Sequence, residues 1–386
     1  MSRPDFDVVI VGGGPAGSVL ALLLARYSSA PERIALLQSA TSSQYGYSPE
    51  HDPRVLALNH GSRVLLESLK AWPTEAARIK TIHVSQRGRL GRTLIRHSDF
   101  DVPQLGSVLR YACLHDSLMG AVQACGIQVK TGLAARVGAQ DAEGVTVIQD
   151  DNPLRAAIVV HADGNPATPA QRDYAQMAIL TRARASLPRP GWAFERFTQE
   201  GPLAVLPHPH ALASQSIVWC CTPERAQILK ALSPQDFSAA LTNAFGTRLG
   251  TFTVDGPITA IPLRLNVRSG TVDGRCVAIG NAAQTLHPVA GQGLNLGLRD
   301  AAALAISLRD WLADPSRHAA SALKAFERSR LPDRYLTATL TDSMARTFTS
   351  GLAPVEHMAG LALLGMDLCP ALRAPLARHL LQGLRT

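Results

Sequence analysis

Three glycines near the start of the chain, Gly12, Gly14 and Gly17, have the spacing Gly-x-Gly-x-x-Gly. They follow the apolar run Phe6 to Val11, which is typical of a buried parallel strand, and precede a predicted helix over Ser18 to Tyr27. In such a turn the first glycine permits a tight bend, the second lets a pyrophosphate approach the backbone, and the third allows close packing of helix on strand. The phosphates then lie at the positive end of the helix. The motif predicts a dinucleotide site, without separating FAD from NAD.

A second glycine-rich segment precedes a long amphipathic helix predicted over Leu294 to Ala313. It opens with Gly280 after a predicted strand and reaches the helix through Gly291 and Gly293. A glycine-rich approach to a helix N-terminus is an anion site, suited to the negative charge that develops on a reduced flavin. Together with the first motif it indicates FAD. On spacing alone, a purely structural loop remains the alternative.

Gln38 follows the second apolar run, Arg33 to Leu37. Dinucleotide-binding folds normally place an acidic residue there, which accepts hydrogen bonds from the ribose hydroxyls. The Gln38 carbonyl oxygen can accept such a bond, but without the charge. We therefore expect weaker adenosine binding and an unchanged fold.

Composition argues against several other classes of protein. The net charge is +8, but the arginines are scattered and only 5% of residues are aromatic, so nucleic acid is not an expected partner. The six cysteines form no CxxC pair, and His208 and His210 flank a proline without a nearby carboxylate, so we expect no metal. A strand-like run begins a few residues after Met1, which leaves no room for a secretory signal, and no apolar stretch is long enough to span a membrane. The sequence predicts a cytoplasmic protein.

The remaining pattern predicts an α/β protein with two joined domains. Short alternating runs between Ala178 and Ile261 indicate a mostly antiparallel sheet, interrupted by a helix near Gln235 to Phe245. The last fifty or so residues read as helices broken by Pro354, Pro370 and Pro375. Other predicted helices cover Val64 to Trp72 and Leu114 to Cys125, and other predicted strands cover Ile127 to Lys130, Val145 to Gln149, Ala157 to Ala162 and Cys276 to Ile279.

Four segments together resemble the group A flavoprotein aromatic hydroxylases: Gly12 to Gly17, Asp52 to Leu58, Ala162 to Gly164, and Gly280 to Asp300. The similarity covers nearly the whole chain. Within that family the chain resembles the ubiquinone-biosynthesis branch, which contains the 2-polyprenyl-6-methoxyphenol hydroxylases, because Phe194 to Pro207 and the Asn281/Gln284 form of the last motif are marks of that branch.

The resemblance implies a Rossmann-type FAD-binding domain (residues 1–75, 102–172 and 266–345), an interleaved, mostly antiparallel substrate domain (76–101 and 173–265) and a C-terminal helical segment (346–386). It implies cofactor contacts along the chain and a substrate-facing strand that includes Phe194 and Phe197, with Glu195 and Arg196 pointing elsewhere. The implied cofactor-binding residues are Gly12, Gly14, Pro15, Ala16, Gly17, Gln38, Arg54, Asp163, Gly164, Gly280, Asn281, Pro288, Gly291, Gly293, Leu294 and Asn295.

The implied activity is hydroxylation of the aromatic ring of a polyprenyl phenol, with NAD(P)H as electron donor and O2 activated as a flavin C4a-hydroperoxide. No nucleophile or paired carboxylate is needed from the protein, and no catalytic residue is assigned; His287 is either a proton handler or a loop residue. A flavin-poor, non-catalytic member of a quinone-synthesis assembly, an FAD-dependent prenyl reductase and a plain NAD dehydrogenase remain as alternatives.

Three positions depart from the family pattern: Asn281 stands in place of an aspartate, Ala167 replaces a serine, and Tyr111 occupies a position where many relatives have an arginine. The segment after Gly164 is also short, which puts the NAD(P)H route in question. Finally, leucines recur at near-helical spacing between Leu361 and Leu384, with Arg373, Arg378 and Arg385 supplying positive charge. We expect peripheral binding to the inner face of the cytoplasmic membrane, with packing of these leucines on the FAD domain as the alternative.

Overall fold

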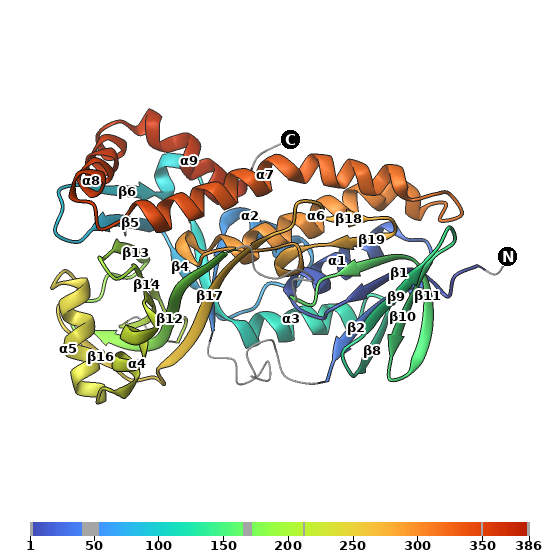
Figure 1. Cartoon of the computed structure of the whole chain (residues 1–386), viewed down its shortest axis with the longest axis horizontal. Coiled ribbons are helices and arrows are strands. Elements are labelled where there is room, and N and C mark those ends of the chain that lie inside the picture. Colours follow the sequence, from blue (N-terminus) through green and yellow to red (C-terminus); the bar gives the residue numbers. More distant parts are fainter. Residues whose placement is uncertain (1–2, 41–53, 165–171, 211–212, 349, 384–386) are drawn as a thin grey trace.

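The computed structural model describes residues 3–40, 54–164, 172–210, 213–348 and 350–383. The described part has one lobe around the N-terminal strands and another around the strands of the predicted substrate domain, and the long helix α7 (Ala320–Thr347) lies along both (Figure 1). Asp52, Ala167 and Arg385 lie outside the described residues.

The first lobe is built on a largely parallel sheet. Its strand order is β18 (Val272–Asp273), β19 (Cys276–Ala278), β11 (Asn152–His161), β1 (Phe6–Val11), β2 (Ile34–Ser39) and β8 (Gln128–Gly132). β1 is parallel to both of its neighbours, and all six of its residues are buried, as its apolar run predicts. The predicted opening of strand, turn, helix and strand is confirmed.

Helices cover one face of this sheet and strands cover the other. Helices α1 (Pro15–Tyr27), α3 (Tyr111–Gln123) and α6 (Gln292–Leu312) bury their apolar sides against it in the main hydrophobic core. The opposite face packs against the antiparallel strands β9 (Arg136–Gln140) and β10 (Val145–Gln149). The carboxyl end of β1 lies between α1 and β11. In such folds a dinucleotide binds at this position.

The second lobe contains the predicted, mostly antiparallel sheet. Its order is β20 (Gln284–Thr285), β17 (Thr259–Val267), β12 (Arg172–Ala185), β15 (Ser214–Cys221), β14 (Pro202–Pro207), β13 (Trp192–Phe197), β5 (Thr81–Gln86) and β6 (Arg92–Arg96), and β16 (Phe252–Val254) pairs with β12. Helices α4 (Pro223–Ala231) and α5 (Pro234–Phe245) cover one face. Each begins with a side-chain cap, Thr222 for α4 and Ser233 for α5. The sequence predicted α5 but not α4.

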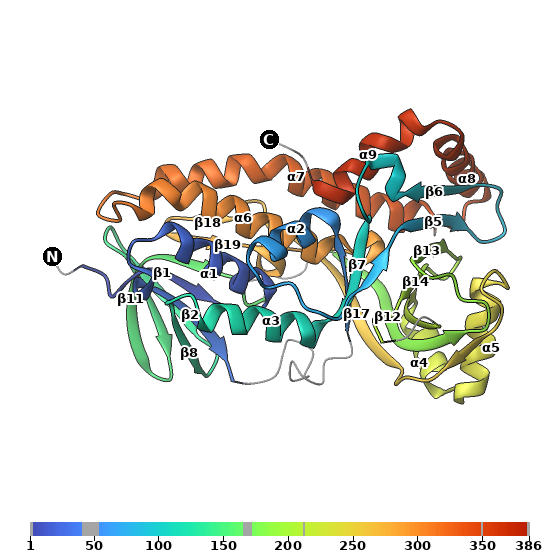
Figure 2. The same cartoon turned by 180° about the vertical axis from the view of Figure 1, so that it is seen from behind.

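A three-stranded sheet joins the lobes (Figure 2). It consists of β3 (Val55–Asn59), β7 (Gly106–Arg110) and β4 (Ala77–Ile79), and β3 leads directly into α2 (His60–Ser68). Residues 76–101 supply β5 and β6 to the second sheet, while β20, from residues assigned to the FAD domain, pairs with β17. Because strands cross between the two lobes in this way, the sheets alone do not define the domain boundaries, which stay a prediction.

The C-terminal region consists of α7, α8 (Ala353–Leu368) and α9 (Pro370–Gln382). Pro354 and Pro370 lie in the first turns of α8 and α9, where the missing N–H has no consequence. Pro375 lies inside α9 and does not break it, so that part of the prediction was wrong. In the described ranges no single helix is long and apolar enough to cross a membrane; α8 and α9 satisfy that test only as a pair, bent by 98°.

Buried ion pairs fasten α7 to α6. Arg330 donates to Asp300 at 2.8 Å and to Asp333 at 2.6 Å, and Arg299 on α6 donates to Asp333 at 2.9 Å. These side chains are almost inaccessible to solvent, so removing one partner would leave a buried charge uncompensated. The network fixes the position of α6, whose N-terminus is part of the candidate site.

Candidate cofactor site

The three glycines of the first motif have distinct surroundings. A Cβ at Gly12, where φ is 116°, would collide with the backbone of Asp163, and a Cβ at Gly17 would collide with the carbonyl oxygen of Gly12. At Gly14 no atom lies within 4 Å of the position a Cβ would take. Gly12 and Gly17 therefore allow close packing, and Gly14 leaves open space at the start of α1.

The two glycine motifs meet in space. Gly280, in the 3-10 turn η4 (Gly280–Ala282), has φ 59°, and a Cβ on it would lie 3.3 Å from the Cβ of Ala16. A Cβ on Gly297 of α6 would lie 3.0 Å from the Cα of Gly280. Ala16 in the first turn of α1 and Gly297 in the second turn of α6 thus both pack against Gly280. α1 begins with Pro15, and Gly14 and Gly291, at the N-cap positions of α1 and α6, have no side chain to cap the first N–H groups.

The start of α6 and the turn before it contain a second open position. Gly291, in the 3-10 turn η5 (Val289–Gly291) that follows the half-buried Pro288, has φ 59° and approaches Ala57 of β3. At Gly293, as at Gly14, no atom lies within 4 Å of where a Cβ would stand. Leu294, next in the chain, packs against the main core.

Asn295 holds this loop in place. Its Oδ1 accepts hydrogen bonds from the backbone N–H of Asn59 and the hydroxyl of Ser62, and its Nδ2 donates to the carbonyl oxygens of Ala57 and Gly291. The side chain is 1% exposed. All four hydrogen bonds of the Asn295 side chain are made within the protein, so this residue positions the loop. Both N–H donors of its amide are used, and neither is free for a ligand.

Five further predicted cofactor residues each have their own surroundings. Gln38 donates from Nε2 to the hydroxyl of Thr131 at 2.7 Å, while its Oε1 lies 2.9 Å from where a Cβ on Gly13 would stand. The Asp163 backbone packs on Gly12, and Gly164 has φ 78°. Arg54 lies over the ring of Tyr111, with 4.5 Å between its Cζ and the ring centroid. Asn281 is half-buried in η4.

His287 is a buried loop residue. Its Nε2 lies 3.0 Å from Oε1 of Gln176, and its Nδ1 lies 3.3 Å from the backbone N–H of Val289. Because that N–H must donate, Nδ1 is the acceptor and Nε2 carries the proton. Burial lowers the pKa of His287 to about 4, although the Asp342 carboxylate acts in the opposite direction. At neutral pH both ring nitrogens are occupied, which favours the loop role over the proton-handling role.

Phe194 and Phe197 lie on opposite faces of β13. Phe194 packs edge-on against Phe245 of α5, in the core beneath the helices. Phe197 stacks on Phe348 at 3.9 Å, in a cluster with Val289 of η5. The sequence predicted that both side chains face the substrate from one surface. This was wrong, because residues three apart on a strand point to opposite sides. Glu195, predicted to point elsewhere, shares the face of Phe197.

Four residues form a row across that second face. Strand register places Leu180, Val218, Ala204 and Glu195 side by side on β12, β15, β14 and β13. All four are half-buried, although their strands lie within the sheet. Tyr174, in a small cluster with Val218, contacts the ring of His287 edge-on at 5.0 Å. The sequence did not single out this row or Tyr174, since only the strand register places them together.

The histidine pair at 208 and 210 shows no metal-site geometry. The backbone N–H of His210 donates to Nδ1 of His208, and burial lowers the pKa of His208 to about 4. Among the described residues no group of three or more His, Cys, Asp or Glu could hold a metal ion.

These features fit an extended dinucleotide. Gly14 and Gly293 leave open space at two helix N-termini without a side-chain cap, and both helices contact Gly280. A model of the family described as FAD binding domain matches residues 5–334, most of the chain. The chain belongs to this family.

Relatives of this FAD-binding protein are similar along almost its whole length. Ubiquinone hydroxylase UbiL of Rhodospirillum rubrum is 29% identical over 98% of this chain and 90% of its own. The 3-demethoxyubiquinol 3-hydroxylase of Escherichia coli is 27% identical over 99% of this chain and 100% of its own.

Solved structures share the fold. The p-nitrophenol 4-monooxygenase PnpA of Pseudomonas putida has a TM-score of 0.73 at 14% identity, over 100% of both chains. PqsL of Pseudomonas aeruginosa, titled a probable FAD-dependent monooxygenase, has a TM-score of 0.71 at 18% identity, over 92% of this chain and 99% of its own. The Rossmann-type domain with an interleaved antiparallel sheet is therefore confirmed.

Proposed function

We propose that this protein is an FAD-dependent monooxygenase that hydroxylates the aromatic ring of a polyprenyl phenol in ubiquinone synthesis, with NAD(P)H as electron donor. The observation that carries the proposal is the pair of open glycine positions, Gly14 at the N-cap of α1 and Gly293 in the first turn of α6, on two helices that both contact Gly280. This arrangement occurs in a chain similar from end to end to ubiquinone hydroxylases.

The pyrophosphate of FAD would lie over Gly14, where the backbone N–H groups and the dipole of α1 favour negative charge. Oε1 of Gln38, oriented by Thr131, would accept from the adenosine ribose. Asn281 would face the ribityl chain, with Arg54 and Asp163 along the cofactor. The flavin ring would lie against Pro288 to Asn295, with the open space at Gly293 beside it.

Reduced FAD, when bound, activates O2 and supplies the oxygen atom that is transferred to the ring. The protein's own task is to orient the phenol and exclude water. The row of Leu180, Val218, Ala204 and Glu195 faces the same way as Phe197, toward the loop that carries His287 and Val289. We place the substrate ring between this face and that loop, with Phe197 as the substrate-facing aromatic residue and Phe194 as core.

We further propose that the enzyme works at the inner face of the cytoplasmic membrane, where a polyprenyl phenol and other ubiquinone-synthesis enzymes would be met. Met358, Leu361 and Leu368 lie on one face of α8 and are more than half exposed, as is Leu372 of α9. By contrast, Leu363 and Leu381 are buried in the body of the protein. We therefore assign the membrane role to the exposed side chains and the packing role to the buried leucines.

The test is aerobic turnover of the purified, FAD-loaded protein with a short-chain polyprenyl phenol and NADPH or NADH. We expect a flavin absorption spectrum, O2 uptake that matches NAD(P)H oxidation, and a product that gains one oxygen atom from O2. A prenyl reductase would oxidise NAD(P)H without incorporating oxygen, and a non-catalytic assembly member would retain little flavin. Either result would reject the hydroxylase.

A further inference from the structure

Four arginines gather at the far end of the second lobe, on the sheet face covered by α5. Strand register places Arg92 and Arg196 on either side of Ser85, and the guanidinium of Arg196 donates to the Ser85 hydroxyl at 3.4 Å. Arg248 comes from the loop after α5, and Arg87 follows β5 and donates to the side chain of Asn243 on α5 at 3.0 Å. We call these four residues the arginine cluster.

The arginine cluster lies over a buried histidine. His83 is 2% exposed, its Nδ1 lies 3.4 Å from Nη1 of Arg248, and its Nε2 has no hydrogen-bond partner among the described residues. Burial, then the charge of Arg248, lowers the pKa of His83 to about 4, so the ring is neutral near pH 7 and accepts from Arg248 through Nδ1. The histidine therefore orients one guanidinium of the cluster without adding charge.

Within the part of the chain that the structure describes, no carboxylate forms an ion pair with any of these arginines. Glu356 pairs with Arg89, and Glu200 pairs with Arg225. The charges instead act on one another, and Arg248 and Arg87 contribute to a lowered pKa of Arg196, whose main cause is burial. Nε of Arg196 is buried without a partner. Like charges held this close are unfavourable unless an anion joins them.

Open space adjoins the arginine cluster. A groove of about 840 Å³ runs between α5 and β16, and its lining includes Asn243, Gly246 and Thr247. Arg87 reaches Asn243, and Nη2 of Arg196 lies 3.8 Å from where a Cβ on Gly246 would stand. A ligand held by the guanidinium groups therefore has room to extend along α5.

We propose that the arginine cluster binds a phosphate group, separately from the FAD site. Phosphate suits it because several planar guanidinium forks can share the oxygens of one doubly charged group, while Ser85 supplies a neutral donor. A single carboxylate would leave most of the positive charge unneutralised.

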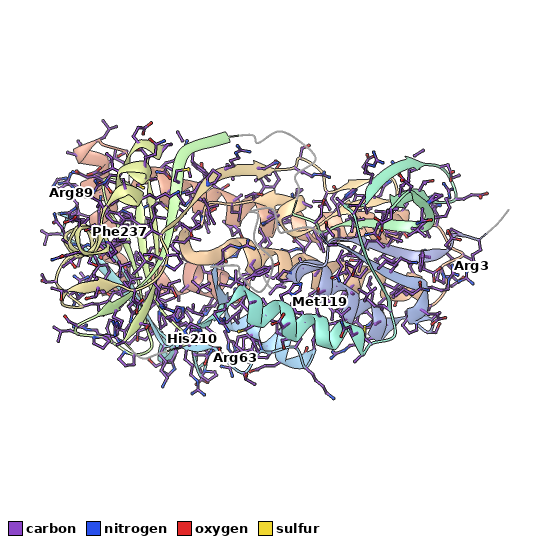
Figure 3. The ribbon with its side chains drawn as sticks, turned by 90° about the horizontal axis from the view of Figure 1, so that it is seen from below. Arg3, Arg63, Arg89, Met119, His210 and Phe237 are labelled. Atoms are coloured by element: carbon purple, nitrogen blue, oxygen red, sulfur yellow. The ribbon has the colours of Figure 1, made fainter. Side chains whose placement is uncertain are left out.

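The phosphate could belong to a lipid headgroup or to a soluble phosphate ester. Figure 3 places Arg89, next to the cluster in sequence, at the same end of the molecule as Phe237 of α5 and far from Arg3. The turn between β5 and β6 carries Leu90, which is 85% exposed and packs its backbone against Gly360 of α8. A lipid headgroup as the source of the phosphate requires the membrane association proposed above. A soluble phosphate ester does not require it.

The experiment uses FAD-saturated protein, so that the pyrophosphate site is filled. Three proteins are compared: wild type, the double variant Arg92→Gln/Arg248→Gln, and the control Arg136→Gln, which removes an exposed arginine on β9 of the first lobe. Each is titrated calorimetrically with inorganic phosphate and with glycerol 3-phosphate, and each is sedimented with vesicles of neutral lipid, with or without phosphatidic acid. Flavin content and thermal unfolding report on folding.

We expect the double variant to lose at least about tenfold in affinity for the phosphate-bearing probe, because charge-assisted hydrogen bonds are lost, while Arg136→Gln binds like wild type. Binding to phosphatidic acid vesicles but not to the soluble probes identifies a lipid headgroup, and the reverse identifies a soluble ester. The double variant should unfold at a higher temperature than wild type without phosphate, since repulsion is relieved. Equal binding of all three proteins, or none by wild type, would overturn the proposal whatever the hydroxylase activity.

Discussion

The amide oxygen of Asn295 accepts a hydrogen bond from the backbone N–H of Asn59 at 2.9 Å, so the first turn of α6 is fastened to the end of β3. The same side chain donates to the carbonyl of Gly291 at 2.6 Å. One buried amide therefore sets the position of the glycine loop that we propose to hold the flavin ring.

Replacing Asn295 with alanine should destabilise the protein and weaken FAD retention together. Four groups lose their partner, two of them in buried and two in partly buried hydrogen bonds. Each buried unsatisfied group costs on the order of 1–3 kcal/mol unless water replaces the amide, so we expect the free energy of unfolding to fall by at least about 2 kcal/mol. Urea unfolding of the FAD-free protein measures this change in the free energy of unfolding. Asn152→Ala, at the exposed first residue of β11, is the control. Unchanged stability of Asn295→Ala would remove its positioning role.

Gly14→Val should abolish FAD retention and leave the fold intact. The new side chain meets no protein atom at its Cβ but occupies the space where the pyrophosphate would lie. Gly120→Val, on the exposed side of α3, is the control for valine at an equally open glycine away from the cofactor site. Flavin absorbance after gel filtration and circular dichroism separate binding from folding. Wild-type flavin content in Gly14→Val would exclude the first motif from the cofactor site.

FAD should be bound noncovalently. Attachment needs a nucleophilic side chain at the cofactor, and the two glycine turns contain no cysteine. The nearby histidine, His287, has both ring nitrogens in internal contacts. Precipitation with acid should therefore release all of the flavin into the supernatant, where its fluorescence is measured. Flavin that remains with the washed pellet would contradict this.

Stability should fall as the pH drops from about 6.5 to about 4. His83, His208 and His287 each have a folded-state pKa of about 4, below the ordinary value of 6.5. Between these values the unfolded chain binds more protons, so each histidine lowers the free energy of unfolding by up to about 1.4 kcal/mol per pH unit. Above pH 6.5 this contribution is fully present.

His287→Gln should therefore flatten the pH dependence while keeping an amide beside Gln176. Urea unfolding at several pH values between 4 and 7 gives the slope, and the exposed His357→Gln is the control. A slope for His287→Gln as steep as that of wild type would show that this histidine is not buried in its neutral form.

Local patterns predicted the part of the fold that local physics determines. The apolar run Phe6 to Val11 and the glycines after it specify β1 and the turn almost by themselves. The residue type at each position decides whether its side chain is buried and how closely another backbone segment can approach it. The faces of β13 were not predicted correctly, since neither the twist nor the neighbours of Phe194 can be read from one strand. The row across the second sheet depends on register between strands far apart in sequence.

The C-terminal region shows the same limit. Leucine spacing predicted helices correctly, but not which leucines face the protein, because that depends on what each helix packs against. Arg373, predicted to supply charge to a membrane, is 7% exposed and donates to Asp99 at 2.9 Å, so it is unavailable for lipid. Deleting the chain from Leu361 onward would not isolate membrane contact, because it would also remove the buried Leu363 and Arg373.

The membrane proposal is better tested on the exposed side chains alone. The triple variant Leu361→Ser/Leu368→Ser/Leu372→Ser removes apolar groups that are 53%, 75% and 64% exposed, without touching the core. Insertion of these leucines into an interface would bury apolar area, so we expect at least about a tenfold loss of co-sedimentation with neutral vesicles. The control is Leu133→Ser/Leu187→Ser, at leucines 63% and 64% exposed elsewhere on the molecule. Flavin content checks folding. Equal vesicle binding by the triple variant and the control would place membrane contact, if any, away from α8 and α9.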